Sequence, residues 1–133
     1  MIDIKKQATF WTDGASEDLV VARELLSNGR YRHGLFFLHL ALEKILKAHV
    51  CVDMNDLAPR IHNLIRLSEL TSITFKRPYI GILAELNAFN LEGRYPDSGF
   101  VPITSKEAMD YLKRAEEVFQ WLTHQLKSRL KTI

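Results

Sequence analysis

The feature that most constrains the fold of this chain is a helix-like segment in its first half, residues 35–50, with the sequence LFFLHLALEKILKAHV. Apolar residues occupy nearly all of its sides when the segment is wound at about 100° per residue. A helix that is apolar nearly all round packs against neighbours on most of its sides. The segment is therefore expected to be the central helix of a helical bundle.

The same segment carries a row of ionisable residues, His39, Glu43 and Lys47, with Lys44 beside them. The row spans an arc of roughly 80° on one side of the helix. Because buried and unpaired charges cost several kcal/mol, we expect the row to face solvent, a partner or a cleft. Three interpretations are open. The row is a solvated seam with a helical Glu43–Lys47 pair worth about 0.3–0.5 kcal/mol, the wall of a polar pocket that meets an anion, or a buried polar network at a subunit interface.

The spacing of apolar residues is helical almost throughout the chain. It predicts helices over about residues 11–26, 31–51, 61–70, 78–91 and 105–130. Pro78 suits the first turn of a helix, and Thr104 with Glu107 has the spacing of a capping box. Only the short segment 72–75 shows strand-like character. We therefore expect an all-α, up-down bundle of about five helices, three long and two short, in one domain over residues 1–133.

The composition limits the classes of function. A chain of 133 residues with 47% hydrophobic and 26% charged residues suits one globular domain. A formal net charge of +2 is too small to imply nucleic acid by bulk electrostatics. The single cysteine, Cys51, excludes an internal disulfide and a metal site built on several thiolates. No apolar run suits a signal peptide or a membrane span, so a cytoplasmic location is expected, and no metal or cofactor is predicted.

An irregular segment, EGRYPDSGFVP at residues 92–102, precedes the last predicted helix. Its two glycines and two prolines exclude regular structure. The planar guanidinium group of Arg94 suits either a pair with Glu43 or a phosphate. Tyr95 suits either stacking on a base or a place in the core. His62, close to a helix start, is either a packing residue or a ligand.

Four pieces of the sequence occur in an order that points to a known family. They are EDLVVARELLSNGRY at residues 17–31, A-x-E-K-x-x-K-A at 41–48, HNLIRL at 62–67 and GRYPD at 93–97. In this order and at these separations they resemble the HEPN family, the nucleotide-binding domain of higher eukaryotes and prokaryotes. The resemblance covers about residues 11–119. It departs from the family at His39, where glutamine is frequent, and at Gly93, where alanine is frequent.

The resemblance implies a compact helical bundle that commonly pairs as a homodimer. Such domains often work beside a minimal nucleotidyltransferase, as in a toxin–antitoxin pair. On this basis we expect a module that binds a nucleotide or another phosphate-bearing ligand. The residues expected to line its cleft are Glu43, Lys44, Lys47, His62, Arg94 and Tyr95.

Two alternatives remain open. Many members of the family are ribonuclease toxins that cleave RNA without a metal, and the active members carry an Arg-x(4–6)-His motif at a bundle cleft. The match in this chain is Arg32 with His39, which are therefore the weak catalytic candidates. The family's motif usually lies near the last long helix, where Arg94 and Arg114 have no histidine within the six residues that follow. The other alternative is a structural interaction module without a ligand, which predicts a buried Glu43–Arg94 pair.

Overall fold

The computed structural model describes residues 1–90 and 102–133 of the chain. These residues form five α-helices and one short 3-10 helix, with no strand among them. The elements are α1 (Ile4–Ser27), α2 (Tyr31–Met54), α3 (Leu64–Glu69), α4 (Arg77–Leu86), η1 (Asn87–Phe89) and α5 (Ser105–Leu130). The expected all-α bundle of three long and two short helices is confirmed.

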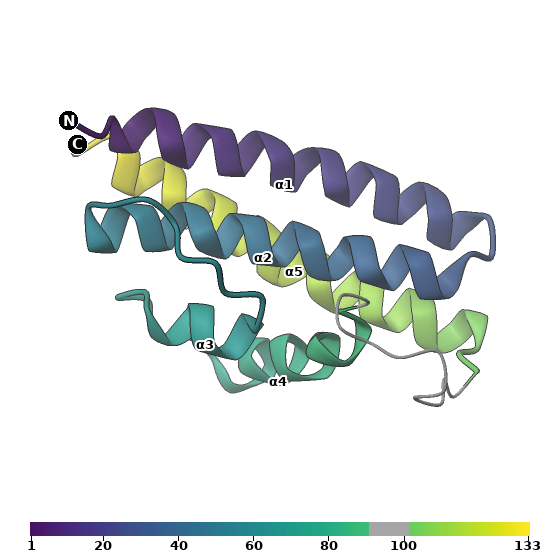
Figure 1. Ribbon diagram of the computed structural model, residues 1–133. Helices are drawn as coiled ribbons and strands as arrows, with labels where there is room; N and C mark the ends of the chain where they lie inside the picture. Colours follow the sequence, from purple (N-terminus) through teal and green to yellow (C-terminus); the bar gives the residue numbers. More distant parts are fainter. Residues whose placement is uncertain (91–101) are drawn as a thin grey trace.

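The three long helices form the body of the molecule, with α2 at its centre (Figure 1). Helices α1 and α2 form an antiparallel hairpin, and α5 packs along both of them. The short helices α3 and α4 lie on the side of α2 away from α1 (Figure 1). Contacts with α1, α3, α4 and α5 explain why α2 is apolar on nearly all of its sides.

Side-chain caps determine where several of the helices begin. The carboxylate of Asp3 accepts a hydrogen bond from the backbone N–H group of Lys6 in the first turn of α1, and the side chain of Asn63 accepts one from Arg66 in α3. Thr104 and Glu107 form the predicted capping box at the start of α5. Between α1 and α2 the chain reverses at Gly29, which has a φ of 77° that glycine adopts without steric strain.

The helix bounds differ from the predicted ones at four points. Helix α1 begins at Ile4 rather than near residue 11, and α2 continues to Met54. Helix α3 begins later than expected, at Leu64, because the asparagine cap lies directly before it. Helix α4 ends at Leu86 and tightens into η1. The segment 72–75 contains no strand, because no other strand among the described residues is there to pair with it.

The core lies where α1, α2 and α5 meet and extends under α3 and α4. Its largest fully buried side chains are those of Leu26, Leu35, Leu38, Leu42, Ile45, Leu46, Leu64, Leu67, Ile82, Leu83, Leu86 and Leu122. Gly34 lets α1 and α2 approach closely, since a Cβ atom at this position would lie 2.6 Å from the Leu26 Cδ2 atom. None of the helices in the described residues is both long and apolar enough to span a membrane.

Candidate functional site

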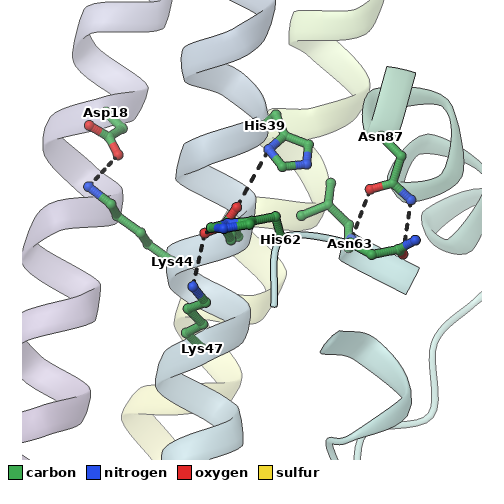
Figure 2. Close-up of polar contacts among 9 residues, drawn as sticks. Asp18, His39, Lys44, Lys47, His62, Asn63 and Asn87 are labelled. Atoms are coloured by element: carbon green, nitrogen blue, oxygen red, sulfur yellow. Dashed lines mark hydrogen bonds and ion pairs between the residues drawn. The ribbon is translucent and has the colours of Figure 1, made fainter. Parts of the chain in front are cut away.

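A polar cluster lies inside the bundle, halfway along α2. We call it the Glu43 cluster and define it as His39, Glu43, Lys47 and His62 (Figure 2). The side chains of Glu43 and Lys47 are 5% and 6% exposed, and His39 is fully buried. The interpretation of this row as a solvated seam is therefore wrong. The row is enclosed within one chain, because α1 and the segment before α3 cover it.

Glu43 holds the cluster together through a single carboxylate oxygen. Its Oε2 atom accepts hydrogen bonds from Lys47 Nζ at 3.0 Å and from His62 Nδ1 at 3.1 Å. An ionised carboxylate has no hydrogen to donate, so the His62 Nδ1 atom carries the proton of this bond. Because the His62 side chain is 47% exposed, the cluster reaches the surface through this residue.

The charge of Lys47 is compensated inside the protein. Its Nζ atom lies 5.1 Å from the centre of the Trp11 ring on α1, on the side where the ring attracts cations. The carboxylate of Glu43 supplies the opposite charge. Lys47 and Glu43 therefore form a buried ion pair, and α1 covers it.

His39 lies next to Glu43 but is held less closely. Its Nδ1 atom is 3.8 Å from Glu43 Oε1, which is beyond hydrogen-bonding distance. Neither ring nitrogen has a hydrogen-bond partner of good geometry among the described residues. Burial lowers the pKa of His39, and the negative charge of Glu43 only partly opposes this effect. His39 is therefore neutral near pH 7 and presents no nitrogen to a substrate.

The position of His62 is fixed by a pair of asparagines that follow it in the chain. Asn63 caps α3 and accepts a hydrogen bond from Asn87 Nδ2 at 3.1 Å. The Asn87 Oδ1 atom accepts the backbone N–H group of Leu64 at 2.8 Å, which ties the start of α3 to the end of α4 (Figure 2). An asparagine before an apolar run is a sequence signal for the cap at Asn63. No signal in the sequence indicates the part taken by Asn87.

Lys44 is expected to line the same cleft, but the structure separates it from the cluster. Its Nζ atom lies 2.8 Å from Asp18 Oδ2 on α1, and it points toward that helix (Figure 2). The stem of Lys44 crosses α1 at Gly14, where a Cβ atom would lie 3.2 Å from Lys44 Cδ. Of the predicted ligand residues, the structure thus brings together Glu43, Lys47 and His62. Arg94 and Tyr95 lie outside the described residues.

Arg32 and His39, the catalytic candidates, occupy different surroundings. They are about 10 Å apart along α2. Arg32 is exposed and borders a cavity of about 400 Å³ at the turn between α1 and α2, whereas His39 is buried. The cavity is lined by Gly29, Arg30, Tyr31, Arg32, His33, Pro102 and Ile103. The two candidates therefore do not form one open catalytic site within a chain.

A second cavity, of about 350 Å³, lies between α4 and α5. Its lining residues are Glu85, Lys106, Glu107, Asp110, Tyr111 and Arg114. Arg114 is paired with Glu85 and lies 3.6 Å from Asp110, so its charge is already matched. Three carboxylates make this cavity unsuitable for a phosphate. Among the described residues no group of three or more His, Cys, Asp or Glu side chains is placed to hold a metal ion.

A further buried network, which the sequence did not indicate, joins α2 to α5. His49 Nε2 donates to the Leu122 carbonyl at 2.8 Å, and its Nδ1 accepts from Arg129 at 3.0 Å. Arg129 also pairs with Asp53. Burial lowers the pKa of His49 to about 4. With both ring nitrogens used inside the fold, His49 has a structural rather than a ligand-binding position.

Both the sequence and the helical fold of this chain are similar to those of known proteins. The chain matches the HEPN domain over residues 8–126. This chain belongs to the HEPN family. Among solved structures, it is similar to TT1696 from Thermus thermophilus, with 20% identity, a TM-score of 0.75 and coverage of 89% of this chain and 97% of that one.

A second solved structure, ST0689, is described as an archaeal HEPN homologue. It has 21% identity, a TM-score of 0.72 and coverage of 90% of this chain and 97% of that one. At these identities the two structures establish the HEPN fold alone. No curated protein matches the sequence.

Proposed function

We propose that this HEPN module binds a nucleotide or another phosphate-bearing ligand. We also propose that it forms a homodimer and acts with a minimal nucleotidyltransferase, in a pair of the toxin–antitoxin type. Membership of the family, whose name refers to nucleotide binding, supports the ligand class. The partner and the dimer rest on what such domains commonly do.

The observation that carries the ligand part is the half-exposed imidazole of His62, bound at Nδ1 to a buried carboxylate. A histidine held in this way is oriented by the protein rather than by solvent. It is also the one member of the Glu43 cluster with substantial exposure, since the other three are buried. Contact between the cluster and a ligand therefore requires His62.

Isothermal titration tests the ligand part directly. The purified chain is titrated with ATP, ADP, AMP and the guanine nucleotides at low ionic strength, where electrostatic contacts are least screened. Saturable heat with at least one of them is the expected result. The absence of binding to every nucleotide would remove the ligand part of the proposal.

The partner part needs a separate experiment. The chain is co-expressed with a minimal nucleotidyltransferase from the same source, and light scattering after size-exclusion chromatography gives the mass of each species. We expect a dimer of the chain alone and a heavier complex with the nucleotidyltransferase. A chain of 15.4 kDa that elutes as a monomer in both samples would contradict this part.

One observation favours the alternative function, a metal-independent endoribonuclease. The cavity at the α1–α2 turn has Arg30, Arg32 and His33 around it, and cationic groups of this kind attract the phosphates of RNA. The test is RNA cleavage in EDTA by the wild type, Arg32→Ala and His39→Ala. Cleavage that requires Arg32 in a chain that stays folded would support this alternative. Absence of cleavage by the pure wild type would exclude it.

A further inference from the structure

We propose that the outward faces of α1 and α5 form the interface between two copies of this chain, with α1 of each copy packed along α5 of the other. This inference rests on the homodimer of the proposed function and names the surface that forms it. It follows from the position and the charge of exposed side chains on the two helices.

Helix α1 carries a stripe of exposed side chains opposite its buried residues. The members recur at intervals of three and four residues, which keeps them on one side of the helix. Two of them are large apolar side chains, Phe10 at 66% exposure and Val20 at 47%. The other members are Lys6, Asp13, Glu17 and Glu24. Two carboxylates therefore lie between the two apolar side chains.

Helix α5 carries a stripe with the same spacing and the opposite charge near its end. The members of this stripe are Lys113, Glu117, Gln120, His124, Lys127 and Lys131, all of them exposed. The neighbouring Arg129 is paired with Asp53, so its charge is already matched. Lys127 and Lys131 form no such pair within the described part of the chain. The last turns of α5 therefore present an excess of positive charge.

The relative height of the two stripes follows from an ion pair between the helices. Arg23 of α1 pairs with Glu116 of α5, and the two helices run antiparallel (Figure 1). Because each helix rises about 1.5 Å per residue, Asp13 is level with about residue 126 of α5, next to Lys127. Phe10 is level with about residue 129. The carboxylates of α1 thus lie at the height of the lysines of α5.

A twofold axis parallel to the long helices converts this register into contacts between two copies. Rotation about such an axis keeps every residue at its own height and allows α1 of one copy to lie beside α5 of the other. Asp13 then faces Lys127 of the partner subunit, and Glu17 lies close to His124 of the partner subunit. The contact occurs twice, because a twofold interface is self-complementary.

The apolar part of the interface lies next to these charges. Phe10 borders a surface cavity of about 560 Å³, which is lined by Asp3, Lys5, Lys6, Thr9, Phe10 and Asp13. This cavity lies at the height of the end of α5. The chain ends there with Ile133, whose side chain is 58% exposed. Phe10 and its cavity therefore receive Ile133 of the partner subunit.

The charges favour this arrangement over the other pairings of the two helices. Two α1 helices packed together would bring the carboxylates of Asp13 and Glu17 near their own copies, and like charges repel. Two α5 helices would do the same with Lys127 and Lys131. Glu24 is level with about residue 115, between a lysine and a glutamate of α5, so it favours neither arrangement.

This interface does not involve the Glu43 cluster. His62 of the cluster precedes α3, which packs against α2 and α4. The dimer and the binding of a nucleotide can therefore be tested separately.

The experiment reverses the charge of each face in turn. The acidic-face variant is Asp13→Lys with Glu17→Lys, and the basic-face variant is Lys127→Glu with Lys131→Glu. All four side chains are exposed, so both variants should fold, and circular dichroism checks this. Light scattering after size-exclusion chromatography at low ionic strength gives the mass of each protein, because salt screens such contacts.

A matched control reverses two exposed charges of α3, outside the proposed interface. This variant is Arg66→Glu with Glu69→Lys. It should have the mass of the wild type, which is expected to be twice 15.4 kDa.

Each face variant alone should be a monomer where the wild type is a dimer. The dissociation constant should rise at least about tenfold, because the reversed charges repel the facing helix. An equal mixture of the two face variants should again form a dimer. In the mixture, the reversed acidic face of one variant meets the reversed basic face of the other, and both contacts are attractive.

The failures are distinguishable. If either folded face variant remains a dimer, or if the mixture stays monomeric, the inference is wrong and the homodimer of the proposed function stands. If the wild type itself is a monomer, the homodimer part of the proposed function fails, and this inference fails with it.

Discussion

Replacement of one partner of the Glu43–Lys47 pair should destabilise the protein far more than a surface helix pair would. Both side chains are at most 6% exposed, so loss of one partner leaves the other buried without its counter-charge. Such a loss costs about 3–5 kcal/mol, whereas an exposed pair at the same spacing contributes about 0.3–0.5 kcal/mol. We expect Glu43→Gln to lower the free energy of unfolding by about 3–5 kcal/mol, because it leaves the ammonium group of Lys47 buried without a counter-charge. Lys47→Met should lose less, since His62 still donates to Glu43.

The double variant, Glu43→Gln with Lys47→Met, separates the pair interaction from other effects. Replacing a buried pair by uncharged groups of similar volume is often close to neutral. The double variant should therefore lose less unfolding free energy than the two single variants lose together, by about 2 kcal/mol or more. Urea denaturation measures all four proteins, and the slopes of the transitions show whether the denatured states remain comparable. If each single variant lost less than about 0.5 kcal/mol of unfolding free energy, and the two losses added up to that of the double variant, the two side chains would not form a buried, coupled pair.

Three further predictions concern the packing, the pH dependence and a helix cap. Gly34→Ala should destabilise the protein by about 1–3 kcal/mol, because its Cβ atom would lie 2.6 Å from Leu26 Cδ2. Gly81→Ala, with only one atom 4.0 Å away, should stabilise it by about 0.5–1 kcal/mol, and thermal melting compares the two. Burial lowers the pKa of His49 to about 4, so this residue is neutral in the folded protein near pH 7. As the pH falls, the unfolded chain takes up a proton at this histidine before the folded chain does. Stability should therefore fall between about pH 6.5 and 4, by up to about 3 kcal/mol, and His49→Gln should flatten this part of the urea profile. Thr104→Ala should lower the free energy of unfolding by about 1 kcal/mol, because it removes the side-chain cap of α5. Urea denaturation measures this change, and an unchanged midpoint would show that the cap does not stabilise the protein.

The sequence predicted the fold well because the fold depends on local regularities. Helical spacing of apolar residues, Pro78 at the start of α4 and the Thr104–Glu107 capping box are read directly from neighbouring positions. The helix bounds were predicted less accurately. Helix α1 begins at Ile4, well before the predicted start near residue 11. The start of α3 and the end of α4 also differ, because Asn63 and Asn87 form hydrogen bonds with each other and with the chain at these points.

The candidate site was predicted only in part. The sequence indicated that His39, Glu43 and Lys47 share one side of α2, because a helix fixes that relation. The family resemblance placed Glu43 and His62 in the lining of one cleft, but nothing in the sequence indicated that the two side chains form a hydrogen bond, since they meet across a loop. The sequence also did not indicate that Lys44, one position beyond Glu43, would turn toward Asp18 on α1.

By itself, the sequence determined that this chain forms a bundle around α2 and that α2 carries three ionisable groups at helical spacing. Only the tertiary structure decided that these groups are buried, which of them are paired, and that His62 joins them and reaches the surface. The physical reason is that periodicity specifies the side of a helix on which a residue lies, whereas burial depends on what covers that side. Here Trp11 from α1 and His62 from the segment before α3 provide the cover. A row that would be a solvated seam on an isolated helix is therefore an enclosed ion pair with one exposed histidine at its edge.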